Sequence, residues 1–395
     1  MNYDKYLSEK VKTIKPSGIR KFFDMAATSK DIISLGVGEP DFETPWGARE
    51  RAVKSIRQGE TQYTANSGLI ALRKRIAEYQ KVRYGLTYDP EKEIVVTVGA
   101  SEAIDLAFRA LIDPGDEIII PDPSYVSYAP SVVMAGGVPV GVKCEMKDKF
   151  ALGVENLKKA ITPKTKAIVL PYPNNPTGAI MTKEELEAIA PIVIENDLIV
   201  ISDEIYSELT YGMVHTSIAS LPDMRERTIV INGFSKAFAM TGWRLGYFCA
   251  PEPLTKQMLK IHQYVIMCAP TAAQYCALEA LESGLKNDFA DVNRMRDEYD
   301  MRRRYLVHEL NEIGLETFEP RGAFYVFPKV SSLGMTGEEF ASRLIKEQKL
   351  AVVPGNAFGD NGEDFVRISY AYSIDSLQKA MVKIREFVKQ YVIKK

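Results

Sequence analysis

Between residues 90 and 250 the sequence repeats short, continuous apolar runs that are separated by stretches with helical periodicity. Each run is four or five residues long, rich in Ile and Val, and does not alternate with polar residues. This pattern is typical of strands buried on both faces of a parallel sheet. The repeated strand–helix order predicts right-handed crossovers and a doubly wound α/β sheet. The predicted strands are Ile94–Val98, Glu117–Ile120, Val138–Val142, Ala167–Leu170, Leu198–Ser202, Thr228–Asn232 and Leu245–Cys249.

The sequence changes character beyond about Gly284. A charged helical run through Arg294–Glu309 precedes alternating strand-like pieces and a final basic amphipathic helix. A chain of 395 residues is too long for one core and suggests two or three domains. We predict a large domain at 49–284 that carries the sheet, and a smaller α+β domain at 285–395. The N-terminal segment, 1–48, is expected to pack with the smaller domain.

Composition and charge exclude several classes of protein. Apolar residues make up 46% and charged residues 26% of the chain, values near the globular average, which excludes disordered and fibrous proteins. A net charge of −2 attracts neither nucleic acid nor an anionic membrane, and Tyr264–Ala269, the longest apolar run, is too short to cross a bilayer. Scattered cysteines and histidines without metal-ligand spacing predict reduced thiols, a cytoplasmic location and no metal site.

Polar residues follow the predicted strands at the points where each strand ends. Ligands of open α/β sheets bind beyond the carboxyl ends of the strands, so these residues are candidates for a site. In chain order they are Gly99-Ala100-Ser101, Tyr125, Asn175, Asp203 with Tyr206, Ser235-Lys236, and Arg244. Ala100 and Ser101 would begin a helix whose free N–H groups suit a phosphate. Lys236 has apolar sequence neighbours, which favour a neutral, nucleophilic amine.

Each of these residues also has an ordinary structural explanation. Asp203 could cap a helix, and Asn175 could stabilise an Asn-Pro turn. Lys236 could lie on the surface, and Arg244 could pair with a carboxylate. Their combination at one sheet edge favours a site instead. The Gly-Val-Gly at 36–38 lacks a third glycine and cannot open a helix, which disfavours a dinucleotide site.

Five sequence runs resemble the signatures of the class I aminotransferases that depend on pyridoxal 5'-phosphate. They occur in family order over nearly the whole chain: SLGVGEPDF at 34–42, PNNPTG at 173–178, SDEIY at 202–206, SKAFAMTGWRLGY at 235–247 and VRISYA at 366–371. The resemblance implies fold type I, a cofactor held by the large domain, and transfer of an amino group from an L-amino acid to a 2-oxo acid. The expected acceptor is 2-oxoglutarate, the expected mechanism is ping-pong exchange, and the expected role is amino acid biosynthesis.

The resemblance also implies a role for each candidate residue. Lys236 would bind the cofactor covalently and carry the proton, while Asp203 would keep the ring nitrogen protonated. The other roles are Tyr206 and Asn175 at the phenolic oxygen, Tyr125 against the ring, Ala100, Ser101, Ser235 and Arg244 at the phosphate, and Gly38, Asn175 and Arg367 at the substrate. Tyr63 would reach the phosphate of a neighbouring subunit, which implies a homodimer.

The resemblance leaves the amino donor and one alternative reaction open. Ser101 stands where the aspartate-specific branch has a lysine, whereas 16–22 and the SDEIYSELTY run are similar to enzymes for acetylated diaminopimelate, alanine or aromatic amino acids. Arg20 is a candidate for binding a distal carboxylate. A C–S β-lyase would use the same cofactor machinery. The intact Lys236 disfavours a structural protein without chemistry.

Overall fold

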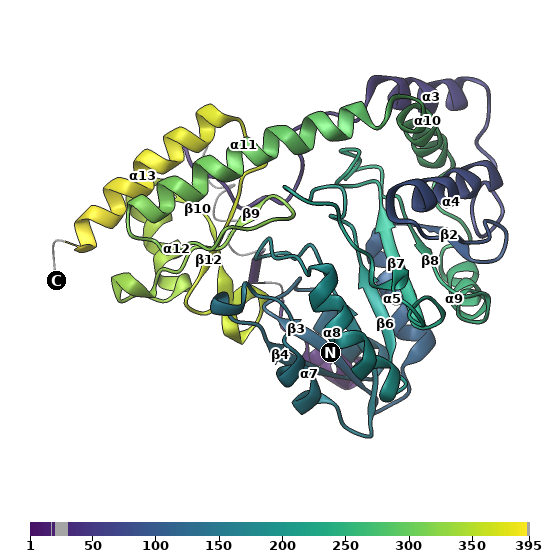
Figure 1. Ribbon diagram of the computed structural model, residues 1–395, viewed down its shortest axis with the longest axis horizontal. Coiled ribbons are helices and arrows are strands. Elements are labelled where there is room, and N and C mark those ends of the chain that lie inside the picture. Colours follow the sequence, from purple (N-terminus) through teal and green to yellow (C-terminus); the bar gives the residue numbers. More distant parts are fainter. Residues whose placement is uncertain (17, 20–30, 393–395) are drawn as a thin grey trace.

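The computed structural model describes residues 1–16, 18–19 and 31–392 and contains two separate groups of strands (Figure 1). The larger group is a seven-stranded sheet with the order β2-β8-β7-β6-β5-β3-β4. Only β8 runs antiparallel to its neighbours. All seven predicted strands form, with ends within two residues of those expected: β2 Ile94–Thr97, β3 Glu117–Asp122, β4 Val138–Lys143, β5 Thr165–Leu170, β6 Ile199–Asp203, β7 Thr228–Gly233 and β8 Gly246–Cys249.

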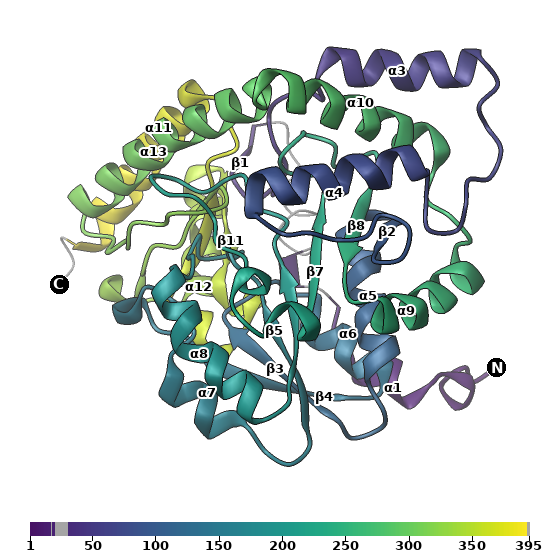
Figure 2. The same ribbon diagram turned by 45° about the vertical axis from the view of Figure 1, so that its right-hand side comes forward.

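Helices cover both faces of this sheet, so the doubly wound arrangement is confirmed (Figure 2). Ile201 and Ile229 pack on one face, against the core of α5, α6 and α9, whereas Val200 and Val230 point to the other, against α4, α7, α8 and α10. These helices are α4 Ile70–Tyr84, α5 Gly99–Leu111, α6 Tyr128–Ala135, α7 Val154–Ala160, α8 Lys183–Glu195, α9 Glu252–Val265 and α10 Thr271–Asn287.

One predicted strand differs from expectation in its burial. Val138, at the start of β4, is 46% exposed. β4 lies at the edge of the sheet and pairs only with β3, so it is not buried on both faces. A short apolar run therefore predicted the strand correctly but not its place in the sheet.

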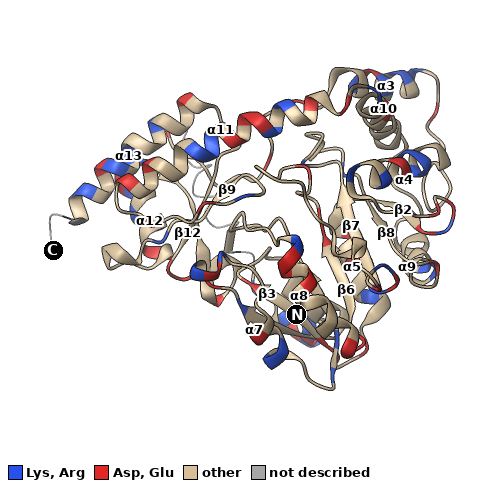
Figure 3. Cartoon of the chain, viewed as in Figure 1, with Lys and Arg blue, Asp and Glu red and all other residues tan. Residues whose placement is uncertain are grey.

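The second group of strands forms a smaller core with the last three long helices. These elements are β1 Ile33–Ser34, β9 Tyr325–Val326, β10 Leu350–Ala351, β11 Val353–Pro354, β12 Val366–Ser369, α11 Ala290–Glu312, α12 Gly337–Gln348 and α13 Ile374–Val392. β11, β12 and β9 form an antiparallel sheet, while β1 pairs in parallel with β10. The N-terminal strand β1 therefore pairs with a strand from the C-terminal part of the chain. Charges of both signs alternate along α11 and α13 (Figure 3).

The remaining elements are short or peripheral. They are α1 Glu9–Thr13, α3 Trp46–Arg57 and the 3₁₀ turns η1 Asp4–Tyr6, η2 Met146–Asp148, η3 Ile218–Ser220, η4 Arg225–Arg227, η5 Ser331–Leu333, η6 Gly355–Phe358 and η7 Asp360–Gly362. Of the helices in the described ranges, none is both long and apolar enough to cross a membrane.

Candidate active site

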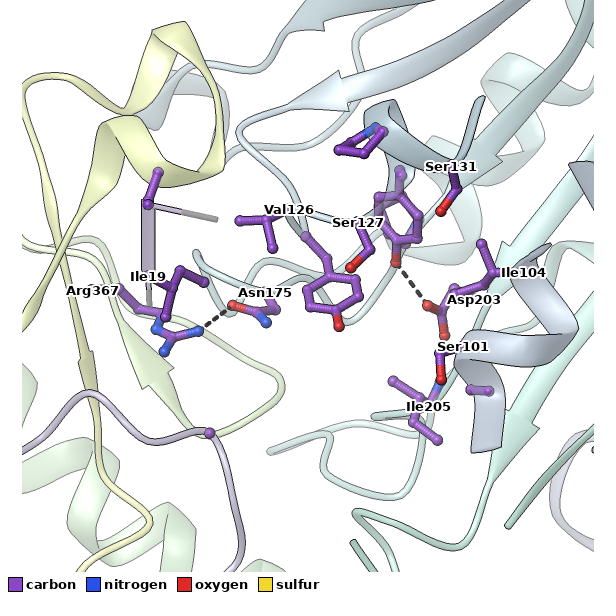
Figure 4. A pocket seen from close by; sticks show the side chains of 18 of the residues that line it. Ile19, Ser101, Ile104, Val126, Ser127, Ser131, Asn175, Asp203, Ile205 and Arg367 are labelled. Atoms are coloured by element: carbon purple, nitrogen blue, oxygen red, sulfur yellow. Dashed lines mark hydrogen bonds between the residues drawn. The ribbon is translucent and has the colours of Figure 1, made fainter. Parts of the chain in front are cut away.

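A cavity of ≈ 1290 Å³ opens beyond the carboxyl ends of β3, β5, β6 and β7, and residues of the smaller core close its other side. Figure 4 shows Arg367 and Asn175 on one side of this cavity, and Asp203 and Ser101 on the other. The predicted residues that line it are Gly38, Ala100, Ser101, Tyr125, Asn175, Asp203, Tyr206, Ser235, Lys236, Arg244 and Arg367. The structure thus brings together residues that lie more than 300 positions apart in the chain.

One corner of the cavity is a cradle for an anion. Gly99 begins α5 with φ +75°, and a Cβ at this position would lie 2.7 Å from Nη2 of Arg244. Ala100 and Ser101 follow in the first turn, where backbone N–H groups lack partners within the helix. Arg244 donates from Nη2 to Oγ of Ser101 at 3.2 Å and from Nη1 to the carbonyl of Thr241 at 3.0 Å. It forms no ion pair with a described carboxylate, so its charge is available to a phosphate.

Lys236 lies in the turn after β7 and points into the cavity instead of the solvent. Its Nζ donates to the carbonyl oxygen of Gly38 at 2.7 Å. Burial, with a smaller contribution from Arg367 and Arg244, lowers the pKa of the Lys236 amine to about 8, against the opposing effect of Glu39 and Asp203. A substantial fraction of the amine is therefore neutral near physiological pH, as a nucleophile requires.

This lowered pKa predicts the pH dependence of Lys236 reactivity in the protein without a bound cofactor. Labelling by an amine-reactive reagent should rise with pH and reach half its maximum near pH 8, because only the neutral amine reacts. An ordinary exposed lysine, with a pKa near 10.4, would still be far from half reaction at this pH. Peptide mass spectrometry at a series of pH values measures both in one sample. A Lys236 profile that coincides with those of surface lysines would contradict the assigned environment.

Asp203 ends β6 as a buried carboxylate. Its side chain is 6% exposed, and burial raises its pKa to about 6 despite hydrogen bonds that lower it. Oδ2 accepts from the hydroxyl of Tyr128 at 2.7 Å, and Oδ1 accepts from the backbone N–H of Ile205 at 3.2 Å. A turn, not a helix, follows β6, so the helix-cap explanation is wrong. No described basic group forms an ion pair with this carboxylate, which leaves it free for a cationic ligand.

Arg367 brings a second cation into the cavity from β12. Its Nη1 donates to Oδ1 of Asn175 at 2.9 Å, and Nη2 donates to the carbonyl of Gly36. Nε is buried and lacks a hydrogen-bond partner among the described residues. The guanidinium carbon of Arg367 lies 4.4 Å from the ring centroid of Tyr325 and 4.8 Å from that of Phe358. A fixed guanidinium in the wall of the cavity suits a carboxylate ligand.

Asn175 takes part in this contact instead of stabilising its own turn. The turn is held by Asn174, whose Oδ1 accepts from the backbone N–H and the hydroxyl of Thr177 at 3.2 and 2.9 Å. Oδ1 of Asn175 is therefore free to accept from Arg367. The explanation of Asn175 as a residue that stabilises the turn is therefore wrong, because Asn174 has that role.

Two predicted residues are not placed at the cavity. Tyr63 is 79% exposed and does not line it. Arg20 lies outside the described residues. Conversely, the sequence interpretation missed Tyr128, Tyr325 and Phe358. Tyr128 stands three residues after Tyr125, and this spacing is the one sequence signal that could have identified it.

Comparison with known proteins identifies the family of this chain. The sequence model of the family "Aminotransferase class I and II" matches residues 30–384. The Bacillus subtilis protein YugH is 54% identical over 97% of this chain and 98% of its own length. The aspartate aminotransferase of Pyrococcus abyssi is 47% identical, again over 97% of this chain and 98% of that one. The crystal structure of an aromatic aminotransferase from Pyrococcus horikoshii superimposes with a TM-score of 0.89 and 46% identity, covering 93% of this chain and 99% of that chain.

Proposed function

Because the chain belongs to the class I and II aminotransferases, which are enzymes that depend on pyridoxal 5'-phosphate, we propose that it transfers the amino group of an L-amino acid to 2-oxoglutarate by a ping-pong mechanism. The observation that carries this proposal is the placement of Lys236, Asp203 and Arg367 around one cavity. They come from three separate elements of the chain and offer an amine, an anion and a cation to the same space.

The residues present fit the cofactor. When bound, pyridoxal phosphate supplies an aldehyde that combines with a primary amine and a ring that accepts electrons from the substrate carbon. The Gly99 cradle with Arg244 suits its phosphate, and the unpaired carboxylate of Asp203 suits its ring nitrogen. Tyr125 borders the same space and offers a face for the ring.

The side chains of this protein would each perform one part of the reaction. Lys236 holds and releases a proton at Nζ, since its pKa of about 8 allows both states near neutral pH. Arg367 orients the substrate by its carboxylate, and Asn175 holds Arg367 in place at 2.9 Å. Asp203 stays ionised opposite the ring nitrogen because each charge stabilises the other.

The identity of the amino donor and the metabolic role are separate, more specific proposals. The relatives named above include an aspartate and an aromatic aminotransferase, so a role in amino acid biosynthesis is proposed without selecting one donor. Purified protein should be assayed with aspartate, alanine, aromatic amino acids and acetylated diaminopimelate, each with 2-oxoglutarate. Formation of glutamate and the matching 2-oxo acid supports the proposal. Release of ammonia and a thiol from a cysteine conjugate would instead identify a C–S β-lyase.

A homodimer is also part of the proposal. Tyr63 lies beside a second exposed loop, because Thr271 donates to the carbonyl of Gln62 at 2.8 Å and Asn66 donates to that of Met267 at 2.9 Å. Tyr63 is 79% and Tyr264 85% exposed, and Val265, Ile266 and Met267 are each at least 43% exposed, so apolar side chains of these two loops are uncovered in one subunit. We propose that a second copy covers these side chains and that Tyr63 then reaches the phosphate site of that copy, as the family resemblance implies.

Subunit mixing should test this assignment. A dimer of two Lys236→Ala subunits and a dimer of two Tyr63→Ala subunits are each expected to be impaired. In a mixed dimer, one of the two sites combines the intact Lys236 of one subunit with the intact Tyr63 of the other. Random reassembly should therefore restore about one quarter of wild-type activity, because half the dimers are mixed and half their sites are intact. If Tyr63 served its own subunit, mixing would restore nothing.

The predicted domain boundaries and location complete the proposal. We place the cofactor in a domain at 49–284, with 285–395 and the N-terminal segment forming the part that carries Arg367. The pairing of β1 with β10 supports this grouping of the two chain ends. A cytoplasmic location is supported by Cys144, Cys249, Cys268 and Cys276, which are all unpaired.

A further inference from the structure

Tyr325 is a residue of the cavity to which neither the sequence interpretation nor the proposed function assigns a role. It begins β9, where it pairs in register with Ser369 of β12, two positions after Arg367. It is 1% exposed, yet its side chain borders the cavity. A large side chain with a polar end is thus fixed between the cavity and the smaller core.

The ring of Tyr325 supports the guanidinium of Arg367. The centre of that cation lies 4.4 Å from the ring centroid of Tyr325, and the ring of Phe358 also contacts it, at 4.8 Å. Cation–π contacts of this kind are stronger when both groups are removed from water, and Arg367 is buried. The ring therefore limits the directions in which Arg367 can present its donors.

The hydroxyl of Tyr325 serves a different neighbour. It lies 3.0 Å from the hydroxyl of Tyr206, within hydrogen-bond distance. It also requires a glycine at position 38, since a Cβ there would lie 2.3 Å from it. The carbonyl of Gly38 is in turn the acceptor for Lys236 at 2.7 Å. The hydroxyl therefore contacts two of the residues that surround the reacting amine.

We propose that Tyr325 is a positioning residue with two separable functions, in which its ring holds Arg367 for the substrate carboxylate and its hydroxyl holds Tyr206 for the cofactor. This inference rests on the cofactor placement proposed above. The two functions explain why Tyr325 contacts both Arg367 and Tyr206. Burial raises the pKa of Tyr325, and this keeps the phenol protonated and able to hydrogen-bond.

Two substitutions separate these functions. Tyr325→Phe keeps the ring and removes the hydroxyl, so KM should stay within about twofold of wild type. The pH midpoint at which the visible absorbance of the bound cofactor changes should move by roughly half a unit or more, because a hydrogen bond near the cofactor is lost. Tyr325→Leu removes both and should also raise KM about tenfold, the loss expected from a desolvated cation–π contact.

A double variant and a matched control make the test specific. If the hydroxyl acts through Tyr206, Tyr325→Phe should cause no further change of the spectral midpoint in a Tyr206→Phe background. Tyr370→Phe is the control, since Tyr370 is equally buried and its hydroxyl donates to the carbonyl of Ala323 at 3.1 Å, away from the cavity. This control should leave the midpoint and KM unchanged.

The outcomes distinguish this inference from the proposed function. An unchanged midpoint in Tyr325→Phe, or an effect that persists without the Tyr206 hydroxyl, would overturn the inference and leave the proposed function intact. The same holds if Tyr325→Phe raises KM as much as Tyr325→Leu. A wild-type protein that binds no cofactor with a visible band would overturn the proposed function, and the inference with it.

Discussion

Replacing Lys236 with alanine should abolish amino transfer and remove the visible absorption of the bound cofactor. The side chain supplies the primary amine of the cavity and the group that carries the proton, so the rate should fall on the order of 10⁴-fold. Stopped assays of 2-oxo acid formation and an absorption spectrum of the purified variant measure the two effects.

The matched control is Lys183→Ala. Lys183 is an exposed lysine at the start of α8, outside the cavity, and its loss should change neither the rate nor the spectrum. Near-wild-type turnover by Lys236→Ala would refute the assignment of the whole site, because the proposed reaction requires the amine of Lys236.

Replacing Asp203 with asparagine should leave the cofactor bound but lower the rate by roughly a hundredfold or more. An amide cannot balance a protonated ring nitrogen, and removing one partner of a buried charge pair costs about 3–5 kcal/mol, where about 1.4 kcal/mol is tenfold in rate. Steady-state kinetics at saturating cofactor give the loss. A variant within about fivefold of wild type would leave Asp203 with a structural role only.

The stability of the same variant provides an independent measurement. A carboxyl group whose pKa is raised to about 6 in the folded protein favours folding at low pH, and this contribution is lost as pH rises through that value. In the protein without cofactor, the ionised carboxylate of Asp203 therefore lowers the stability of the folded state at pH 8. Asp203→Asn should melt no more than ~4 °C below wild type under these conditions. A much lower melting temperature would mean that lost packing explains the lost activity.

The large sheet could be predicted from the sequence because its signal is local. Runs such as Ala167–Leu170 are apolar throughout, and polar residues follow within a few positions at the edge where ligands bind. The smaller core gave a weaker signal, since β9, β10 and β11 have two residues each. The boundary predicted at 284/285 falls near the end of α10, and the domain division stays a prediction.

The candidate site was predictable only where a residue follows a strand or matches a family run. Tyr325 and Phe358 were missed because their importance comes from contacts with Arg367, which no local pattern encodes. Tyr128 was missed because its partner, Asp203, is 75 positions away. The role of Tyr63 depends on a second copy of the chain and stays a prediction.

The parallel pairing of β1 with β10 has a consequence for how the protein is made. Ile33 and Ser34 leave the ribosome more than 300 residues before their partners Leu350 and Ala351. The seven-stranded sheet has all its strands by Cys249, whereas Arg367 emerges roughly ten seconds later at ordinary elongation rates. A nascent chain can therefore complete its lysine-bearing half while the arginine-bearing half still lacks its final strands. During that interval Ile33 and Ser34 have no strand partner, so the smaller core is completed last.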